Sequence, residues 1–407
     1  MSRDKLIAMA RYSHQHAQDG TIAQVDDILQ VPARNYVDAT RWEDEMRQVF
    51  RRLPLMLAIT AEVREPGDYK AMEVAGVPVL IARTKSGVVK AFLNSCSHRG
   101  AQIMLPGSGN THRFTCPYHA WTYNHDGELI AVYAEKDFGA VDKSCNGLVE
   151  LPCCEAAGMV WVTLDPHSPL AIEDFLSGYD EMLANFGFAD WHLYESRTLE
   201  GPNWKIAYDG YMDLYHLPIL HRETFGPQMS NQALYTAWGP HQRVVSPDRN
   251  LAVLQEKPEV EWEVAKLMSG VWTVFPHISI ASFDGGGGRG VMISQLFPGT
   301  RPDQSFTTQL YVLENQPPDE EVARKATEQF EFLKHVVQNE DYATGLRQQT
   351  ALASGLKESV MFGRNEGGGQ HFHGWLEKLL VADNQALGGM FSRDTRPVVH
   401  GDQTVEL

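Results

Sequence analysis

The chain has 407 residues, and 43% of them are hydrophobic, which is ample for at least one large core and excludes a disordered protein. At roughly 150 residues per domain, this length predicts two or three domains. Acidic residues outnumber basic ones by 52 to 35, and no run rich in Lys or Arg stands out. A nucleic-acid-binding role is therefore disfavoured, because it needs a basic surface to meet phosphates.

The N-terminal residues lack the apolar core of a signal peptide, and no uncharged apolar run approaches the roughly 20 residues that cross a bilayer. We therefore expect a cytoplasmic protein with no membrane partner. An odd number of cysteines in a large chain of this kind argues against a disulfide framework. The five are Cys96, Cys116, Cys145, Cys153 and Cys154. Reduced thiols are free to bind metal.

The first half of the chain changes its pattern near residue 62. Residues 1–40 and 42–53 show the spacing of helices, the first of them amphipathic. Residues 62–166 instead hold Val- and Ile-rich runs broken by Ala-Gly and Ser-Gly turns, which indicates strands and hairpins. A polar stretch with two prolines, residues 164–175, marks the expected boundary of this β-rich block.

The second half mixes helices and strands. Residues 172–186 and 203–221 have helix-compatible spacing, and residues 270–315 alternate as strands. Two prolines and an aspartate then precede residues 320–346, a long helical stretch with acids in its first turn. The last residues are polar and are expected to be irregular.

Two short motifs in the β-rich block each supply one thiolate and one imidazole. Cys96 and His98 form the first, Cys116 and His119 the second, and seventeen residues separate His98 from Cys116. In a Rieske centre one iron holds two cysteines and the other holds two histidines, so two loops of this kind can clamp a [2Fe–2S] cluster between them. The neutral imidazoles also raise the reduction potential of the cluster.

The alternative for these motifs is a structural zinc site, which usually pairs like with like as two Cys followed by two His. The mixed pairing makes that alternative the weaker one. Cys145, Cys153 and Cys154 have no His at ligand spacing and are expected to be small buried hydrophobic residues. His112 and His125 lie outside the motif spacing and are expected at the surface or in turns.

A second pair of imidazoles, His216 and His221, lies five residues apart with Pro218 between them. The proline makes an unbroken helix unfavourable, so the pair should straddle a helix end. Two imidazoles and one carboxylate form the facial triad of non-haem Fe(II) oxygenases, which leaves one face of the iron open. Alone, such a pair is more often two ordinary polar residues. Beside the cluster motifs and the acidic Asp213 it becomes a strong signal, because a cluster that carries single electrons needs a site to reduce.

The third ligand must come from elsewhere, and the best candidates are Glu340 and Asp341 on the long helix at 320–346. Both acids fall at the flanks of its apolar face, so periodicity does not choose between them. The alternative is that both are solvated surface acids.

Residues 285–290 satisfy the pattern G-x-G-x-x-G, but a dinucleotide-binding loop needs a helix after it and here a strand pattern follows. We expect a hairpin loop. No other segment offers a nicotinamide or flavin fingerprint, so electrons should arrive from a separate reductase or ferredoxin.

With these residues in place, the chain resembles the catalytic α subunit of the Rieske non-haem iron ring-hydroxylating oxygenases over nearly its whole length. Several positions match functional residues of that family: the cluster ligands Cys96, His98, Cys116 and His119, the iron ligands His216, His221 and Asp341, and the bridging acid Asp213. The resemblance thus favours Asp341 over Glu340. The chain departs from the family at Ala120, commonly Gly, and at Asp209 and Gly210, often Glu and Asn.

The resemblance implies an α+β fold in which a Rieske domain of antiparallel sheets is inserted in a helix-grip catalytic domain with a large antiparallel sheet. We expect an N-terminal helical segment (1–45) packing on the catalytic domain, the Rieske domain (46–165) and the catalytic domain (166–407). It also implies a head-to-tail homotrimer, with or without a small β subunit, in which Asp213 joins the cluster of one subunit to the iron of the next.

The expected function is a terminal oxygenase that uses O₂ at Fe(II) to hydroxylate an aromatic or other apolar substrate in a mostly apolar pocket. Tyr208, Met212, Leu217, Val274 and Phe283 are candidates for its lining, with core packing as their more ordinary role. Ring dihydroxylation is favoured, and monooxygenation or oxidative demethylation is the alternative. The alternatives from other classes are a non-enzymatic Rieske electron-transfer protein and a zinc hydrolase.

Overall fold

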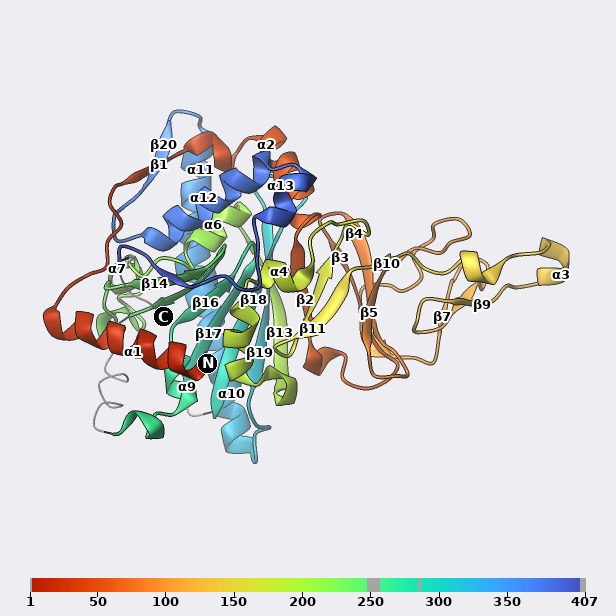
Figure 1. Ribbon diagram of the computed structural model, residues 1–407, viewed down its shortest axis with the longest axis horizontal. Coiled ribbons are helices and arrows are strands. Elements are labelled where there is room, and N and C mark those ends of the chain that lie inside the picture. Colours follow the sequence, from red (N-terminus) through yellow and green to blue (C-terminus); the bar gives the residue numbers. More distant parts are fainter. Residues whose placement is uncertain (1, 247–256, 285–286, 403–407) are drawn as a thin grey trace.

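A computed structural model describes residues 2–246, 257–284 and 287–402, and it shows a body built on one large sheet with a narrower β domain projecting from it (Figure 1). The projecting part carries both cysteine–histidine motifs, and its far end lies well away from the body. The observed mixture of antiparallel sheets and covering helices is the predicted α+β class.

The body is organised by an eight-stranded antiparallel sheet with the order β13-β19-β18-β17-β16-β15-β14-β21. Its strands are β13 (His192–Gly201), β14 (Leu234–Trp238), β15 (His241–Val245), β16 (Val271–Val274), β17 (Ile278–Asp284), β18 (Arg289–Pro298), β19 (Ser305–Leu313) and β21 (Val398–Val399). Chain neighbours β16 to β19 pair in sequence as a meander, so the prediction of alternating strands in residues 270–315 is confirmed.

The candidate iron ligands lie at the two ends of α7 (Leu217–Leu220) and in a π-helix (Val336–Tyr342). The neighbouring helices of the body are α6 (Trp204–Asp209), α10 (Glu320–His335), α11 (Ala343–Ala353) and α12 (Gly367–Val381). The apolar stripe of α10 packs on the sheet, where the ring of Phe330 stacks on Tyr311 of β19 at 5.5 Å. The predicted helix at 320–346 is thus present, but a π-turn interrupts it where the two candidate acids lie.

The projecting domain contains a five-stranded sheet, β10-β5-β4-β3-β6, and a small three-stranded sheet, β7-β8-β9. The strands are β3 (Asp68–Val74), β4 (Val77–Arg83), β5 (Val89–Leu93), β6 (Gly107–Asn110), β7 (Phe114–Thr115), β8 (Thr122–Tyr123), β9 (Leu129–Ala131) and β10 (Glu150–Leu151). A short helix, α3 (Glu135–Phe138), lies at the tip (Figure 1). The prediction of a β-rich block over residues 62–166 is confirmed.

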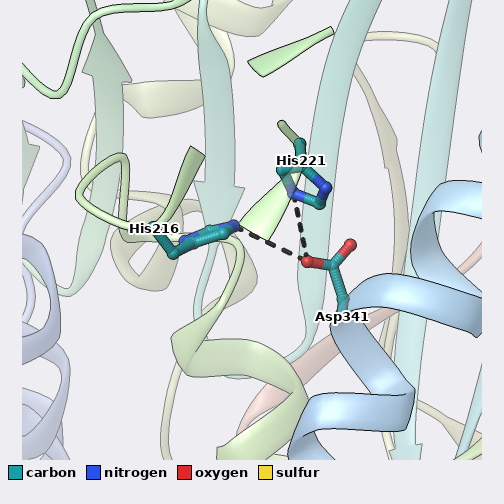
Figure 2. A group of neighbouring side chains, drawn as sticks. All are labelled: His216, His221 and Asp341. Atoms are coloured by element: carbon teal, nitrogen blue, oxygen red, sulfur yellow. Dashed lines mark ion pairs between the residues drawn. The ribbon is translucent and has the colours of Figure 1, made fainter. Parts of the chain in front are cut away.

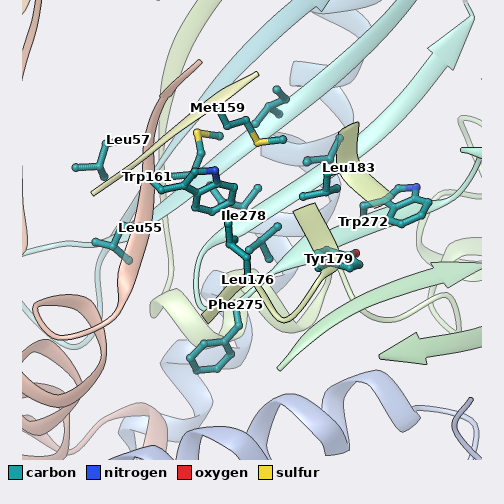
Figure 3. Packing of buried hydrophobic residues seen from close by; sticks show 14 of the residues in the cluster. Leu55, Leu57, Met159, Trp161, Leu176, Tyr179, Leu183, Trp272, Phe275 and Ile278 are labelled. Atoms are coloured by element: carbon teal, nitrogen blue, oxygen red, sulfur yellow. The ribbon is translucent and has the colours of Figure 1, made fainter. Parts of the chain in front are cut away.

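A further three-stranded sheet, β11-β12-β2, joins the two parts. Its strands are β2 (Pro54–Ile59), β11 (Cys153–Ala156) and β12 (Met159–Thr163). Trp161 of β12 and Leu55 of β2 share a buried cluster with Ile278 of the large sheet (Figure 3). Met56 is also held by its backbone, whose N–H donates to His277 Nε2 (3.2 Å) and whose carbonyl accepts from Gln295 Nε2 (2.9 Å). The projecting domain is therefore anchored to the large sheet of the body.

The N-terminal segment departs from the prediction of a helix through residue 40. After α1 (Ser2–Asp19) the chain leaves the helix at Gly20, whose φ of 62° lies in the left-handed region. Strand β1 (Leu29–Pro32) then pairs with β20 (Ser359–Phe362), and a 3-10 helix (Ala33–Tyr36) and α2 (Ala39–Glu45) follow. Helix periodicity in the sequence did not reveal that these residues serve as an edge strand for a distant segment.

Two other predicted helices are broken. Residues 172–186 form α4 (Ile172–Leu176) and α5 (Tyr179–Leu183), separated by Ser177 and Gly178, both with positive φ. Residues 203–221 form only the short helices α6 and α7. In both cases burial of apolar side chains does not require a continuous helix, so periodicity overestimates the length.

The glycine-rich stretch lies between β17 and β18, which pair antiparallel up to Asp284 and Arg289. The expected hairpin is confirmed by these flanking strands, although Gly285 and Gly286 lie outside the described residues. Across residues 2–246, 257–284 and 287–402, no helix is long and apolar enough to cross a membrane.

Candidate metal centres

His216 and His221, at the ends of α7, and Asp341, in the π-helix, point toward one another (Figure 2). The Oδ1 atom of Asp341 lies 3.6 Å from Nε2 of His216 and 3.3 Å from Nε2 of His221. One ligand atom from each residue lies within 4.8 Å of the others, close enough for a single ion. Two imidazole nitrogens and one carboxylate oxygen are the donor set of non-haem Fe(II) sites, so the residues fit that metal.

The two histidines lie at the two ends of α7, a single helical turn. His216 precedes the turn and His221 follows it, with Pro218 within the first turn. Proline suits this position because the first N–H groups of a helix have no partner to lose. The turn therefore presents both imidazoles toward the same place, although their sequence spacing of five does not fit one face of a long helix.

In the π-helix the two candidate acids, although consecutive in the chain, contact different atoms of the imidazoles. Asp341 faces the imidazole Nε2 atoms, whereas Glu340 reaches behind His221, with Oε2 2.5 Å from Nδ1. Asp213 holds His216 in the same way, with Oδ2 2.9 Å from Nδ1. A carboxylate thus contacts Nδ1 of each imidazole, and Nε2 of each faces the centre. This is the usual arrangement around metal-binding histidines.

The charges at this centre favour a cation. Burial lowers the pKa of His221, but hydrogen bonding and charge from Asp341, together with Glu340, more than offset it and leave the pKa above its ordinary value. Three carboxylates and two imidazoles thus share a partly buried site, and a divalent cation would relieve their repulsion.

Two hollows open beside His216. A cleft of about 1010 Å³ is lined by Tyr215, His216, Pro218, Ile219, Leu220, Arg222, Glu223, Met229, Ser230, Asn231, Thr344 and Arg347. A smaller cavity of about 230 Å³ also touches Asp341 and holds the carboxylates of Asp209, Asp213 and Glu366. Neither is lined by the five pocket candidates named from the sequence. Tyr208, Met212 and Val274 are buried in the main core instead.

Asp209, where this chain differs from the family pattern, is engaged away from the iron histidines. Its carboxylate accepts from the hydroxyl of Tyr36 at 2.9 Å and lies 3.0 Å from Nε2 of His373. The N-terminal segment therefore reaches the end of α6, a few residues before Asp213.

The two cysteine–histidine loops have the same backbone hydrogen bonds. The N–H of Cys96 donates to the carbonyl of Ala101 (2.9 Å), and the carbonyl of Cys96 accepts from the N–H of Gly100 (2.8 Å). In the same way the N–H of Cys116 donates to the carbonyl of Trp121 (2.8 Å), and its carbonyl accepts from the N–H of Ala120 (3.0 Å). Gly100 and Ala120 both adopt a left-handed φ, 75° and 54°. The Gly-to-Ala departure thus falls where a side chain is strained, and the loop nonetheless forms.

The four side chains of these loops form two pairs. Cys96 and Cys116 are buried and lie within interaction distance of each other, and the rings of His98 and His119 are 4.7 Å apart. His119 Nδ1 is buried with no hydrogen-bond partner, as expected of a nitrogen that binds a metal. In the described part of the chain, the ligand atoms of His216, His221 and Asp341 lie within 4.8 Å of one another, but no three of the four cluster-loop ligand atoms do so. Separate thiol and imidazole pairs fit a two-iron cluster better than one zinc ion.

Tyr123 is a cluster-site residue that spacing alone does not reveal. Its hydroxyl lies 3.2 Å from Sγ of Cys96 and accepts from the N–H of Ser97 at 3.0 Å. Burial, with the hydrogen bond to Cys96, raises the pKa of Tyr123 to about 12, so the hydroxyl keeps its proton and can donate to the sulfur. The sequence signal that could have pointed to Tyr123 is its position seven residues after Cys116, at the end of a strand pattern.

Of the smaller predictions about this domain, those for the histidines are confirmed and the one for the other cysteines is wrong. His125 lies in a turn, as expected, but it is buried, and its Nε2 lies 2.8 Å from the carbonyl of Thr111. Cys145 is exposed and Cys153 and Cys154 are half-buried, so none of the three is a fully buried hydrophobic residue. His112 is exposed as predicted.

Two families match the chain. The one described as Rieske [2Fe-2S] domain covers residues 54–147, and the one described as Ring hydroxylating alpha subunit (catalytic domain) covers residues 188–382. A carnitine monooxygenase oxygenase subunit from Acinetobacter baumannii is 34% identical over 203 residues, 49% of this chain and 54% of that protein. A glycine betaine monooxygenase oxygenase subunit from Chromohalobacter salexigens is 32% identical over 195 residues, 47% and 43% respectively. The matched segments span about half the length of these curated relatives.

The fold also resembles solved structures. The quaternary ammonium Rieske monooxygenase CntA in complex with L-carnitine superposes with a TM-score of 0.73 at 24% identity, covering 87% of this chain and 96% of that one. These matches confirm the predicted architecture, a Rieske domain beside a catalytic domain with a large antiparallel sheet.

Proposed function

Because this chain belongs to the Rieske non-haem iron oxygenases, as the catalytic α subunit, we propose that it is the terminal oxygenase that inserts oxygen from O₂ into a small organic molecule. The observation that carries the proposal is the convergence of His216, His221 and Asp341 within 4.8 Å in a chain that also has paired thiols and paired imidazoles. When bound, a [2Fe–2S] cluster supplies single electrons and a ferrous ion binds and activates O₂.

The residues of the chain have distinct tasks in this proposal. Cys96, Cys116, His98 and His119 hold the cluster, and His216, His221 and Asp341 hold the iron. The carboxylate of Asp213 accepts a hydrogen bond from Nδ1–H of His216, so Nε2 is the nitrogen that faces the centre. Phe225 stacks on His221 with ring centroids 4.7 Å apart and shields that imidazole from water.

We propose monooxygenation, by hydroxylation or oxidative demethylation, in preference to the ring dihydroxylation favoured from the sequence. The support is that both curated relatives described above are named as monooxygenase subunits, one for carnitine and one for glycine betaine. A quaternary ammonium compound is accordingly the first substrate class to test, ahead of an aromatic hydrocarbon.

The proposed assembly and partners follow the family resemblance. Asp213 borders the 230 Å³ cavity at the surface, where it could meet a cluster histidine of a second copy in a head-to-tail trimer. Electrons would come from a separate reductase or ferredoxin, in keeping with the absence of a nicotinamide or flavin fingerprint in the sequence. We retain 1–45, 46–165 and 166–407 as the proposed domain division.

Metal analysis and isotope labelling test the function. Freshly purified protein should be brown and contain roughly three irons and two acid-labile sulfides per chain. With a reductase, carnitine and glycine betaine should be tried beside benzoate under ¹⁸O₂. One labelled oxygen in the oxidised product supports monooxygenation, and two labelled hydroxyls on a ring restore dihydroxylation. Zinc in place of iron, without sulfide, would refute both.

Two ligand variants separate the enzyme from a simple electron carrier. Cys96→Ser should abolish the visible spectrum of the cluster. His216→Ala should keep that spectrum, lose about one iron per chain and lose turnover. An electron-transfer protein with no second iron would show the same iron content before and after the His216 change.

A further inference from the structure

We propose that Glu340 is a positioning residue for the iron site: its carboxylate orients His221 and thereby sets the affinity of the centre for a divalent metal. This inference rests on the proposed function, because it concerns the same centre. It assigns a task to the acid that sequence periodicity could not distinguish from Asp341.

The contact is short and well buried. Oε2 of Glu340 lies 2.5 Å from Nδ1 of His221, and the two side chains are 13% and 2% exposed. A carboxylate at this distance accepts the Nδ1 proton, so the lone pair of the ring is at Nε2, the atom that faces Asp341. Glu340 therefore selects the tautomer that can bind a metal.

The carboxylate is itself held in place. The hydroxyl oxygen of Thr224 lies 3.1 Å from the same Oε2 and 3.1 Å from the carbonyl oxygen of His221, so its single proton is shared between these two acceptors. Thr224, His221 and Glu340 thus form a closed set of contacts between the end of α7 and the π-helix. A surface acid would gain no such partners, so the solvated alternative for Glu340 does not describe this arrangement.

The backbone explains how neighbours along the chain can do different work. In the π-helix Val336–Tyr342, Asp341 points to the Nε2 side of the imidazoles while Glu340 passes behind His221. The widened turn is what brings both carboxylates to one histidine. Asp213 has the matching contact with His216, but it borders the surface cavity that Glu340 does not line.

Cobalt binding provides a readout that does not depend on turnover. The protein is purified with its cluster intact, cleared of mononuclear metal by a chelator and dialysed against graded Co(II); bound cobalt is then counted by elemental analysis, which separates it from cluster iron. Glu340→Ala should weaken Co(II) binding by about 10- to 100-fold, the usual loss when a group behind a metal-binding histidine is removed. Glu340→Gln keeps an acceptor oxygen for the Nδ1 proton, so it should recover part of the affinity.

Matched variants keep the test interpretable. Glu328→Gln, on the exposed side of α10 where Glu328 pairs with Arg324, should bind Co(II) like the natural protein. Should Glu340→Ala fail to fold, Thr224→Val removes the supporting hydroxyl and should weaken Co(II) binding by a smaller factor. The electron paramagnetic resonance spectrum of bound Co(II) should change in the Glu340 variants, whereas the visible spectrum of the cluster should not.

Each outcome decides something. Unchanged cobalt affinity in Glu340→Ala, or equal losses in Glu340→Ala and Glu328→Gln, would overturn the positioning role while leaving the proposed function intact. If the natural protein binds no Co(II) or Fe(II) at this site, the proposed function itself fails.

Discussion

Replacing Glu45 by Gln should destabilise the catalytic domain strongly, because it strands a buried ammonium group. Lys205, the second residue of α6, is completely buried, and its Nζ lies 2.5 Å from Oε2 of Glu45. The same carboxylate accepts from Nε1 of Trp204 at 2.9 Å and pairs with Arg41 at 3.0 Å. Breaking a buried ion pair from one side costs about 3–5 kcal/mol, since the remaining charge keeps its desolvation penalty.

The cost should depend on pH in a defined direction. Burial already lowers the pKa of Lys205, and Glu45 opposes that shift. Without Glu45, Lys205 would be neutral in the folded protein, whereas it is protonated in the unfolded protein. The free energy of deprotonating it is at most about 4.5 kcal/mol at pH 7 and about 2 kcal/mol at pH 9. The folded state then binds fewer protons than the unfolded state, so the free energy of unfolding rises with pH over this range.

The free energies of unfolding of the natural protein and of Glu45→Gln can be measured by urea unfolding at pH 7 and pH 9, with tryptophan fluorescence as the signal. Glu45→Gln should lose about 3–5 kcal/mol at pH 7, and the gap should narrow at pH 9. The double change Glu45→Gln with Lys205→Met should recover most of the loss, because no charge then remains in the pair. A loss below about 1 kcal/mol at pH 7, or a gap that widens with pH, would refute the reasoning.

Three further outcomes are expected. Ala120→Gly should relieve the left-handed strain in the second cluster loop and stabilise it by up to about 1 kcal/mol, seen as cluster absorbance that persists to higher temperature; an earlier loss would contradict this. Tyr123→Phe removes the hydroxyl beside Cys96 and should lower the reduction potential of the cluster, measured by redox titration, and an unchanged potential would show that the hydroxyl does not donate to the sulfur. Asp213→Asn should keep both metal contents near those of the natural protein yet slow reoxidation of the reduced cluster by O₂ and substrate in single-turnover experiments, and normal rates would remove Asp213 from electron delivery.

The cluster loops and the strand meander were predictable because their signals are local. A thiolate and an imidazole within three or four residues must share a loop, and alternating apolar residues at 270–315 must lie in strands. The family resemblance predicted Asp341, over a hundred residues from His221, as the third ligand, and the ligand atoms of the three side chains do lie within 4.8 Å of one another. Periodicity could not make this prediction, since the two acids flank one face.

What remained hidden depends on contacts between distant segments or on backbone irregularity. The π-turn that separates the tasks of Glu340 and Asp341 has no composition signal. The burial of His125 goes with a hydrogen-bond partner at Thr111, which sequence spacing does not reveal. Likewise, no pattern in the first 45 residues predicts that Tyr36 and Glu45 contact α6 of the catalytic domain.

That last contact has a practical consequence for anyone shortening the chain. The N-terminal segment contacts both ends of α6: Glu45 pairs with Lys205, and the hydroxyl of Tyr36 donates to Asp209. α6 leads directly into the loop that bears Asp213 and His216. Trimming the first 45 residues as a dispensable leader would leave Lys205 without its counter-charge and Asp209 without the Tyr36 hydroxyl. Tyr36 and Glu45 are therefore part of the scaffold that supports the loop bearing Asp213 and His216.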